Sequence, residues 1–253
     1  MSDTQMEQAA GQQPGLTQLQ RVTNTFTAPS KTFEDIKRGN KSWWMPWIIM
    51  AVVGYLFFAV VVNKVGMQQV VDNQIHLNPS QEEKLEQAPP EQRAMSQKIS
   101  LYATEGIFAA SPLLVLAGLA LMSLGLMGTI NFGFGGRAKF GSIFSMWMYA
   151  SLPSIVKTLL GIIVIFAGTA PESFNIKNFA PTNIGAFLNP ADTGKVLSAL
   201  ASSIDVVTIW TLVLLSIGTA TVAGTKRGSG YMAVFGWWVI FVLIGAGIAV
   251  VTG

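Results

Sequence analysis

Long apolar runs without charged residues alternate with polar segments along the chain, and this pattern predicts membrane-spanning helices. A transmembrane helix needs about 20 consecutive, mostly apolar residues, because Lys, Arg or Asp at its centre costs roughly 2.5–3.5 kcal/mol on insertion scales. Four runs meet this requirement without any charge, and a fifth contains Pro153 and Lys157. The predicted spans cover about residues 44–64, 106–130, 141–169, 206–224 and 231–252.

The polar segment before the first span divides into a tail and an amphipathic part. Residues 1–15 are rich in Gln and Gly and lack hydrophobic periodicity, which predicts a disordered tail. In residues 16–41, apolar residues recur every three or four positions, first as far as Phe26 and then in a second helix that Ser30 is expected to cap. We interpret this part as a juxtamembrane collar lying on the bilayer, followed by a five-helix membrane domain at 42–253.

Large apolar side chains near the start of the first span are candidate membrane-interface anchors. Aromatic rings favour the headgroup level of a bilayer, where one edge can stay hydrated. The apolar residues at 33 and 36 fall on one face of the second collar helix, and three tryptophans open the first span. The candidate anchors are Phe26, Phe33, Ile36, Trp43, Trp44 and Trp47.

Lysine and arginine are unequally distributed between the segments that join the spans. Residues 1–41, 131–140 and 224–230 together hold nine Lys or Arg against four Asp or Glu. Residues 64–105, a loop with one short helical segment at 79–87, and residues 169–205 together hold six against nine. Because short segments rich in Lys and Arg stay on the cytoplasmic side, we expect a cytoplasmic N-terminus and, after five spans, a C-terminus outside.

Composition agrees with a membrane protein and excludes several kinds of chemistry. Charged residues make up 11 % of the 253 residues, against roughly 25 % in soluble domains, so the fold class is an all-α polytopic integral membrane protein. The chain has no Cys and a single His, which excludes disulfides, thiolate metal sites and paired imidazole ligands. We therefore predict no catalytic residue, no cofactor and no metal site. The net charge of +3 is too small and too unevenly placed to indicate a nucleic-acid partner.

Lys157 is the main candidate for a functional charge inside the membrane. Counted from Gly141 at about 1.5 Å per residue, it lies roughly 24 Å into a core about 30 Å thick, nearer the outer leaflet. Such a charge could pair with Glu105 or Asp205 near the outer ends of neighbouring spans, or hold an anionic lipid headgroup. Alternatively, its ammonium reaches the outer interface along the flexible side chain.

Small residues at helical spacing within the spans predict close helix contacts. Glycines seven residues apart, or a small pair four apart, allow two helices to approach closely. These contacts would lie within the five-helix bundle or at an interface with another copy or a partner. The residues are Gly118, Gly125, Gly161, Gly168, Gly245 and Ala249.

Several motifs, in their order along the chain, resemble those of Yip1-domain membrane proteins, particularly the bacterial branch. They are FTAPSKTFEDIKRGNKSWWMPWII at the collar, NFGFGG before the third span, YASLP within it, and LNPADTGKVLSALASSIDVVTIWTLVLLSIG around the fourth. The resemblance covers about residues 20–250 and implies a five-helix domain with a cytoplasmic N-terminus. It also implies a role in trafficking or transport, since eukaryotic relatives contact Rab-type GTPases and some bacterial members look like accessory partners of ATP-driven transporters. The cytoplasmic part here is too short for a folded GTPase-binding domain.

From these observations we expect a non-catalytic scaffold or accessory subunit in the bacterial cytoplasmic (inner) membrane. It would act through helix packing and contacts with the lipid bilayer, with a membrane protein, an ATP-driven transporter or a second copy of itself as partner. The alternative is a small transporter, channel or lipid-moving protein with its site around Lys157.

Overall fold

The computed structural model describes residues 15–188 and 193–251, so the predicted tail lies outside the described residues except for Gly15. Within the described residues the regular structure is helical, with one isolated bridge between Asn183 and Asp205. Five helical segments are long and apolar enough to cross a membrane, which confirms the predicted fold class. They are α4 (Trp44–Lys64), α7 (Pro90–Gly128) continued by η1 (Thr129–Gly133), α8 (Phe140–Ala150) with α9 (Ser154–Phe166), α12 (Val206–Ala223) and α13 (Arg227–Val251).

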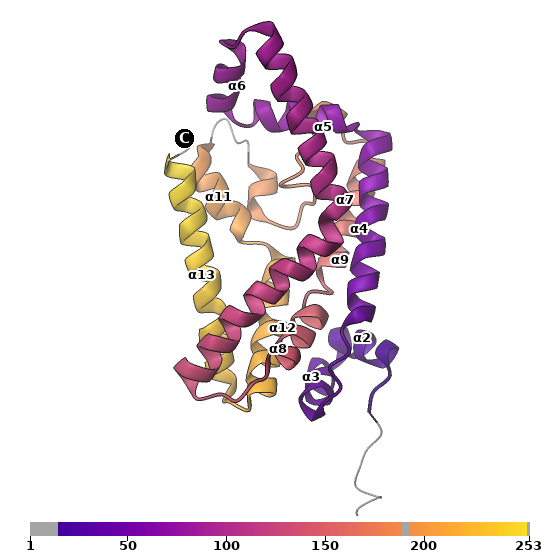
Figure 1. Cartoon of the computed structure of the whole chain (residues 1–253), viewed down its shortest axis with the longest axis vertical. Coiled ribbons are helices and arrows are strands. Elements are labelled where there is room, and N and C mark those ends of the chain that lie inside the picture. Colours follow the sequence, from indigo (N-terminus) through magenta and orange to yellow (C-terminus); the bar gives the residue numbers. More distant parts are fainter. Residues whose placement is uncertain (1–14, 189–192, 252–253) are drawn as a thin grey trace, which may run out of the picture.

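The collar and the end of α13 lie at opposite ends of the molecule, as an odd number of spans requires (Figure 1). The collar comprises α2 (Gln18–Thr27) and α3 (Pro29–Arg38). Helix α2 begins with a capping box, in which the Thr17 side chain accepts from the Gln20 backbone N–H and the Gln20 side chain accepts from the Thr17 N–H.

The expected cap of the second collar helix is wrong. Ser30 lies inside α3, whose N-cap is Ala28 and whose first residue is Pro29. Proline suits this position because its φ is already helical and it has no N–H in need of a partner. The helix therefore begins two residues earlier than the serine-cap signal indicated, and it ends at Arg38, with Gly39 at φ 124° as its C-cap.

The apolar face of α3 packs against protein, which corrects part of the interface prediction. Phe33 and Ile36 are fully buried in the core formed with α8 and α12, so these two residues are not lipid anchors. Phe33 and Met146 both approach Gly218 of α12 closely, where a larger residue would keep them away. Hydrophobic periodicity gives the apolar face of a helix, but it does not tell whether protein or lipid covers that face.

The segment predicted as a long loop after the first span is mostly helical. It contains α5 (Met67–His76), α6 (Pro79–Glu86) and the first turns of α7, which begins at Pro90 rather than near residue 106. The hydropathy pattern marks only the apolar part of α7, whereas the backbone helix continues through the polar residues that precede it. Beyond α9, the chain forms η2 (Pro171–Ser173), η3 (Ile184–Phe187) and α11 (Lys195–Ser203) before it enters α12.

The third span is two helices rather than one. A turn at residues 151–153 separates α8 from α9, because Pro153 has no N–H to continue the helical ladder. Most of α8 is buried, whereas α9 buries only Gly161 and Ile165. The break lets α8 serve as a core helix while α9 packs along α4.

Only some of the predicted small residues lie in close contacts within the chain. Gly125 faces the Trp237 ring of α13, and Gly161 faces the rings of Phe57 and Phe179. The space beside Gly118, Gly168 and Gly245 is open, Ala249 is partly exposed, and Gly168 lies beyond the end of α9 with φ 105°. In the α12–α13 contact it is instead Gly230 that leaves no room for a Cβ, because it lies against the backbone of Ser216.

Replacement of Gly230 by Ala is expected to destabilise the protein by about 1–3 kcal/mol, the usual cost of overpacking a core. A Cβ at this position would meet the Ser216 carbonyl oxygen and Ala220, so α12 and α13 would have to separate. Gly236→Ala, on an open face of the same helix, is the matched control and should be neutral or slightly stabilising. Unfolding in mixed micelles measures both, and equal effects would contradict the assigned contact.

Candidate functional site

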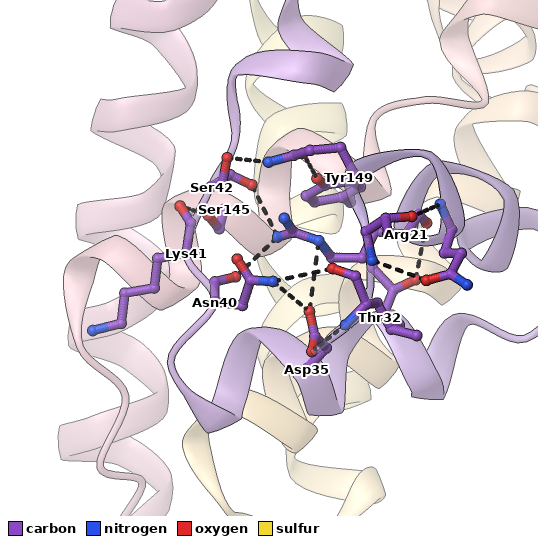
Figure 2. Close-up of polar contacts among 12 residues, drawn as sticks. Arg21, Thr32, Asp35, Asn40, Lys41, Ser42, Ser145 and Tyr149 are labelled. Carbon is purple, nitrogen blue, oxygen red and sulfur yellow. Dashed lines mark hydrogen bonds and ion pairs between the residues drawn. The ribbon is translucent and has the colours of Figure 1, made fainter. Parts of the chain in front are cut away.

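The described residues contain two ion pairs with a buried carboxylate, one at the collar and one within the membrane domain. We call the first the collar network; it is built around Arg21 and Asp35 (Figure 2). Arg21 is only 1 % exposed, and its Nε lies 3.6 Å from Oδ2 of Asp35. Its Nη1 donates to the carbonyl oxygens of Asn40 and Ser42 at 2.9 and 3.1 Å. The guanidinium carbon lies 5.2 Å from the centre of the Tyr149 ring, a distance at which cation–π attraction contributes.

Asp35 accepts further hydrogen bonds that hold the start and the end of the collar together. The Leu16 backbone N–H donates to its Oδ1 at 3.1 Å, and Asn40 Nδ2 donates to its Oδ2 at 3.0 Å. The hydroxyl of Thr32 in α3 donates to the carbonyl oxygen of Arg21 in α2 at 2.9 Å. The two collar helices are therefore fixed to each other by charge-assisted and neutral hydrogen bonds.

The collar network also reaches the third span. The Tyr149 hydroxyl donates to Oε1 of Gln18 at 2.6 Å, and Nε2 of Gln18 donates to the Ser42 hydroxyl. The Ser145 hydroxyl donates to the carbonyl oxygen of Lys41 at 2.5 Å. Because Ser145 and Tyr149 lie one turn apart on α8, they attach both the collar and its connection to α4 to the membrane domain (Figure 2). The collar is thus an integral part of the fold.

The second cluster is the ion pair between Lys157 of α9 and Asp205 before α12. Lys157 Nζ lies 2.9 Å from Asp205 Oδ2, and the same oxygen accepts from the Thr182 hydroxyl at 2.6 Å. Oδ1 of Asp205 accepts from the Thr208 backbone N–H at 2.9 Å and caps α12. The Phe179 ring lies 5.7 Å from Nζ. Both carboxylate oxygens of Asp205 are therefore satisfied, and one carboxylate joins α9, α12 and the connecting segment.

Of the roles considered for Lys157, the structure shows pairing with Asp205. The Asp205 side chain is 2 % exposed and that of Lys157 is 24 % exposed. Glu105 lies on α7 and, within the described part of the chain, forms no ion pair with Lys157. Sequence reasoning named both partners of the pair but had no means to choose between Asp205 and Glu105.

The structure locates Lys157 by its neighbours on α4 rather than by a count along one helix. Helix α9 runs along α4: the Ser154 hydroxyl contacts Met50 Sδ at 3.9 Å, and Gly161, seven residues later, lies against Phe57. These two contacts are seven residues apart on both helices, so residues of α9 lie level with residues of α4 that are numbered 104 lower. Lys157 is therefore level with residue 53, next to the midpoint of α4. The estimate from Gly141 assumed one straight helix, and the break between α8 and α9 removes that assumption.

The other candidate anchors lie partly exposed near the collar end. Trp44 is exposed, whereas Trp43 and Trp47 are half-buried, and Trp47 Nε1 donates to the Pro112 carbonyl oxygen at 3.0 Å. Phe26 is also exposed and packs edge-on against Trp210 of α12, with ring centres 5.7 Å apart.

These features define a polytopic α-helical membrane protein whose buried charges are paired with one another. The family model described as the Yip1 domain matches residues 23–249, so the chain belongs to the Yip1-domain family. No curated protein and no solved structure gave a significant match. The matched region contains the complete Lys157–Asp205 cluster, whereas Gln18 and Arg21 of the collar network precede it.

Proposed function

We propose that this Yip1-domain protein is a non-catalytic scaffold or accessory subunit that binds another membrane protein in a transport or trafficking assembly. We place it in the bacterial cytoplasmic membrane with the collar on the cytoplasmic side, as the excess of Lys and Arg at that end favours. The buried charges support a structural role, since Lys157 and Asp205 neutralise each other and join three segments of the chain.

The observation that best supports this proposal is that most residues of three spans are not buried by the rest of the chain. In the most apolar stretch of α12, 56 % of the residues are buried, against 17 % in α4, 17 % in α7 and 11 % in α13. Gly118 of α7 and Gly245 of α13 lie on these uncovered helices with open space beside them. Small residues on an open helix face permit the close approach of a further helix, which suits a protein that works by helix packing.

Photo-crosslinking in native membranes tests this proposal. A photoreactive residue at Leu121 of α7 or Leu243 of α13, both exposed and close to the open glycines, should give a discrete protein adduct. Ile143, buried in the core, is the matched control and should give none. An adduct at twice the mass of the chain would identify a second copy as the partner. Adducts with lipid alone at both exposed positions would contradict the proposal.

A further inference from the structure

Exposed cations from four separate segments converge at the collar end of the molecule. We call these six residues the basic rim: Lys37, Lys41, Arg137, Lys139, Lys226 and Arg227. All six side chains are exposed, and in the described residues no ion pair involves any of them. Helix α3, the turn after η1 and the turn between α12 and α13 all lie at the lower end of the molecule in Figure 1.

Direct contacts bring these segments together. The Arg137 backbone N–H donates to the Ala223 carbonyl oxygen at 3.0 Å, which fixes the turn after η1 against the end of α12. Lys37 Nζ would lie 3.9 Å from a Cβ at Gly224, which is two residues before Lys226. Residues that are far apart in the sequence are therefore close together at the end of α12.

A second group of contacts places Lys41 and Lys139 together at the start of α8. The Lys41 side chain would lie 3.4 Å from a Cβ at Gly141, and Lys139 is the N-cap residue of α8. In the described parts of the segments that form this end, α3 holds two carboxylates. Asp35 is buried and paired with Arg21, whereas Glu34 is exposed. The basic rim therefore carries a concentrated positive charge that no ion pair among the described residues neutralises.

An exposed aromatic side chain lies beside these cations and indicates the kind of partner. Phe132 in η1 is 95 % exposed. The turn that carries it is closed by Asn131, whose side chain donates to the Ala138 carbonyl oxygen at 2.9 Å and accepts from the Ala138 N–H at 2.8 Å. The same closed turn thus carries the exposed Phe132 and Arg137, a combination that suits the headgroup level of a bilayer, where apolar rings and cations are both satisfied.

We propose that the basic rim and Phe132 form a binding surface for anionic phospholipid headgroups in the leaflet at the collar end. The cations attract the headgroup phosphates, and Phe132 enters the acyl boundary beside them. An acidic soluble protein would match the charge but would leave Phe132 in water. This proposal does not depend on the proposed membrane-protein partner, because lipid binding is measured on the purified chain alone.

The test compares binding of phosphatidylglycerol and phosphatidylcholine with identical acyl chains to the full chain in detergent, measured by native mass spectrometry. We expect the wild type to prefer phosphatidylglycerol. The variant Arg137→Gln/Lys226→Gln/Arg227→Gln should lose this preference by at least about tenfold, since each cation near an anionic surface contributes roughly fivefold. The fold should persist, because Arg137 is anchored through its backbone N–H.

The matched control is Lys84→Gln/Lys98→Gln/Lys177→Gln, which removes three exposed cations outside the basic rim and should keep the wild-type preference. Phe132→Ser should weaken phosphatidylglycerol binding with all charges retained. The proposal is overturned if the wild type shows no preference, if both triple variants behave alike, or if inorganic phosphate at equal concentration displaces the lipid. The proposal would also be overturned if the rim variant no longer bound an acidic soluble protein while its preference for phosphatidylglycerol stayed unchanged.

Discussion

Replacing Asp35 by Ala is expected to lower the free energy of unfolding by about 3–5 kcal/mol, because it leaves the buried Arg21 guanidinium without its counter-charge. The substitution also removes the acceptor for the Leu16 N–H and for Asn40. Unfolding in mixed micelles measures the loss. Since the chain has no Cys, the labelling rate of a single Thr25→Cys reporter, at a buried position within the collar, should rise in the same variant.

Two further variants separate the charge effect from a general effect of mutation in α3. Glu34→Ala changes the exposed neighbouring carboxylate and should alter stability by no more than about 0.5 kcal/mol. Arg21→Met/Asp35→Leu removes both charges and should cost less than Asp35→Ala alone, because no unpaired charge stays buried. If Asp35→Ala were as mild as Glu34→Ala, the collar network would not hold the collar.

The second large effect is expected for Asp205→Asn, at about 2.5–3.5 kcal/mol, the range for an unpaired charge within a membrane. Asparagine keeps an oxygen acceptor for the Thr208 N–H and is itself a favourable N-cap residue, so helix α12 retains its cap. What the variant loses is the charge that neutralises Lys157. The same unfolding measurement applies, with Glu172→Gln, an exposed carboxylate outside the spans, as the control.

Removal of both charges in this cluster should recover much of the lost stability. In Lys157→Met/Asp205→Asn the apolar side chain of Met replaces the ammonium without creating an unpaired charge. The double-mutant cycle isolates the pairing energy from the cost of each single change. A double variant that is less stable than Asp205→Asn would show that Lys157 does not need Asp205 for neutralisation.

The parts of the fold that sequence predicted well depend on local composition. The five spans follow from run length and hydropathy, and the structure has a helical segment at each of them. Pro153 marked the interruption of the third span, although the pattern did not reveal two helices with different packing. The helical start of α7 was missed, because a polar helix outside the bilayer leaves no apolar run to detect.

The candidate sites were predicted less completely, for a physical reason. Lys157 stood out because a lone charge in an apolar run is costly wherever the chain folds, and Asp205 was one of two carboxylates near enough in the topology to pair with it. Arg21 gave no such signal, since the amphipathic pattern places it among the polar residues of its helix, and the polar face of such a helix is expected to face water. Its burial arises only when α2, α3 and α8 pack together.

The sequence by itself determined that this chain lies in a membrane, how many times it crosses, and which ends of the spans carry positive charge. These properties are sums over neighbouring residues, so they are present before any packing. The tertiary structure decided that Asp205 rather than Glu105 pairs with Lys157, that the collar is bound to the domain, and that the basic rim converges at the end of α12. Each of these depends on distances between residues far apart in the chain, which only the packing of the helices sets.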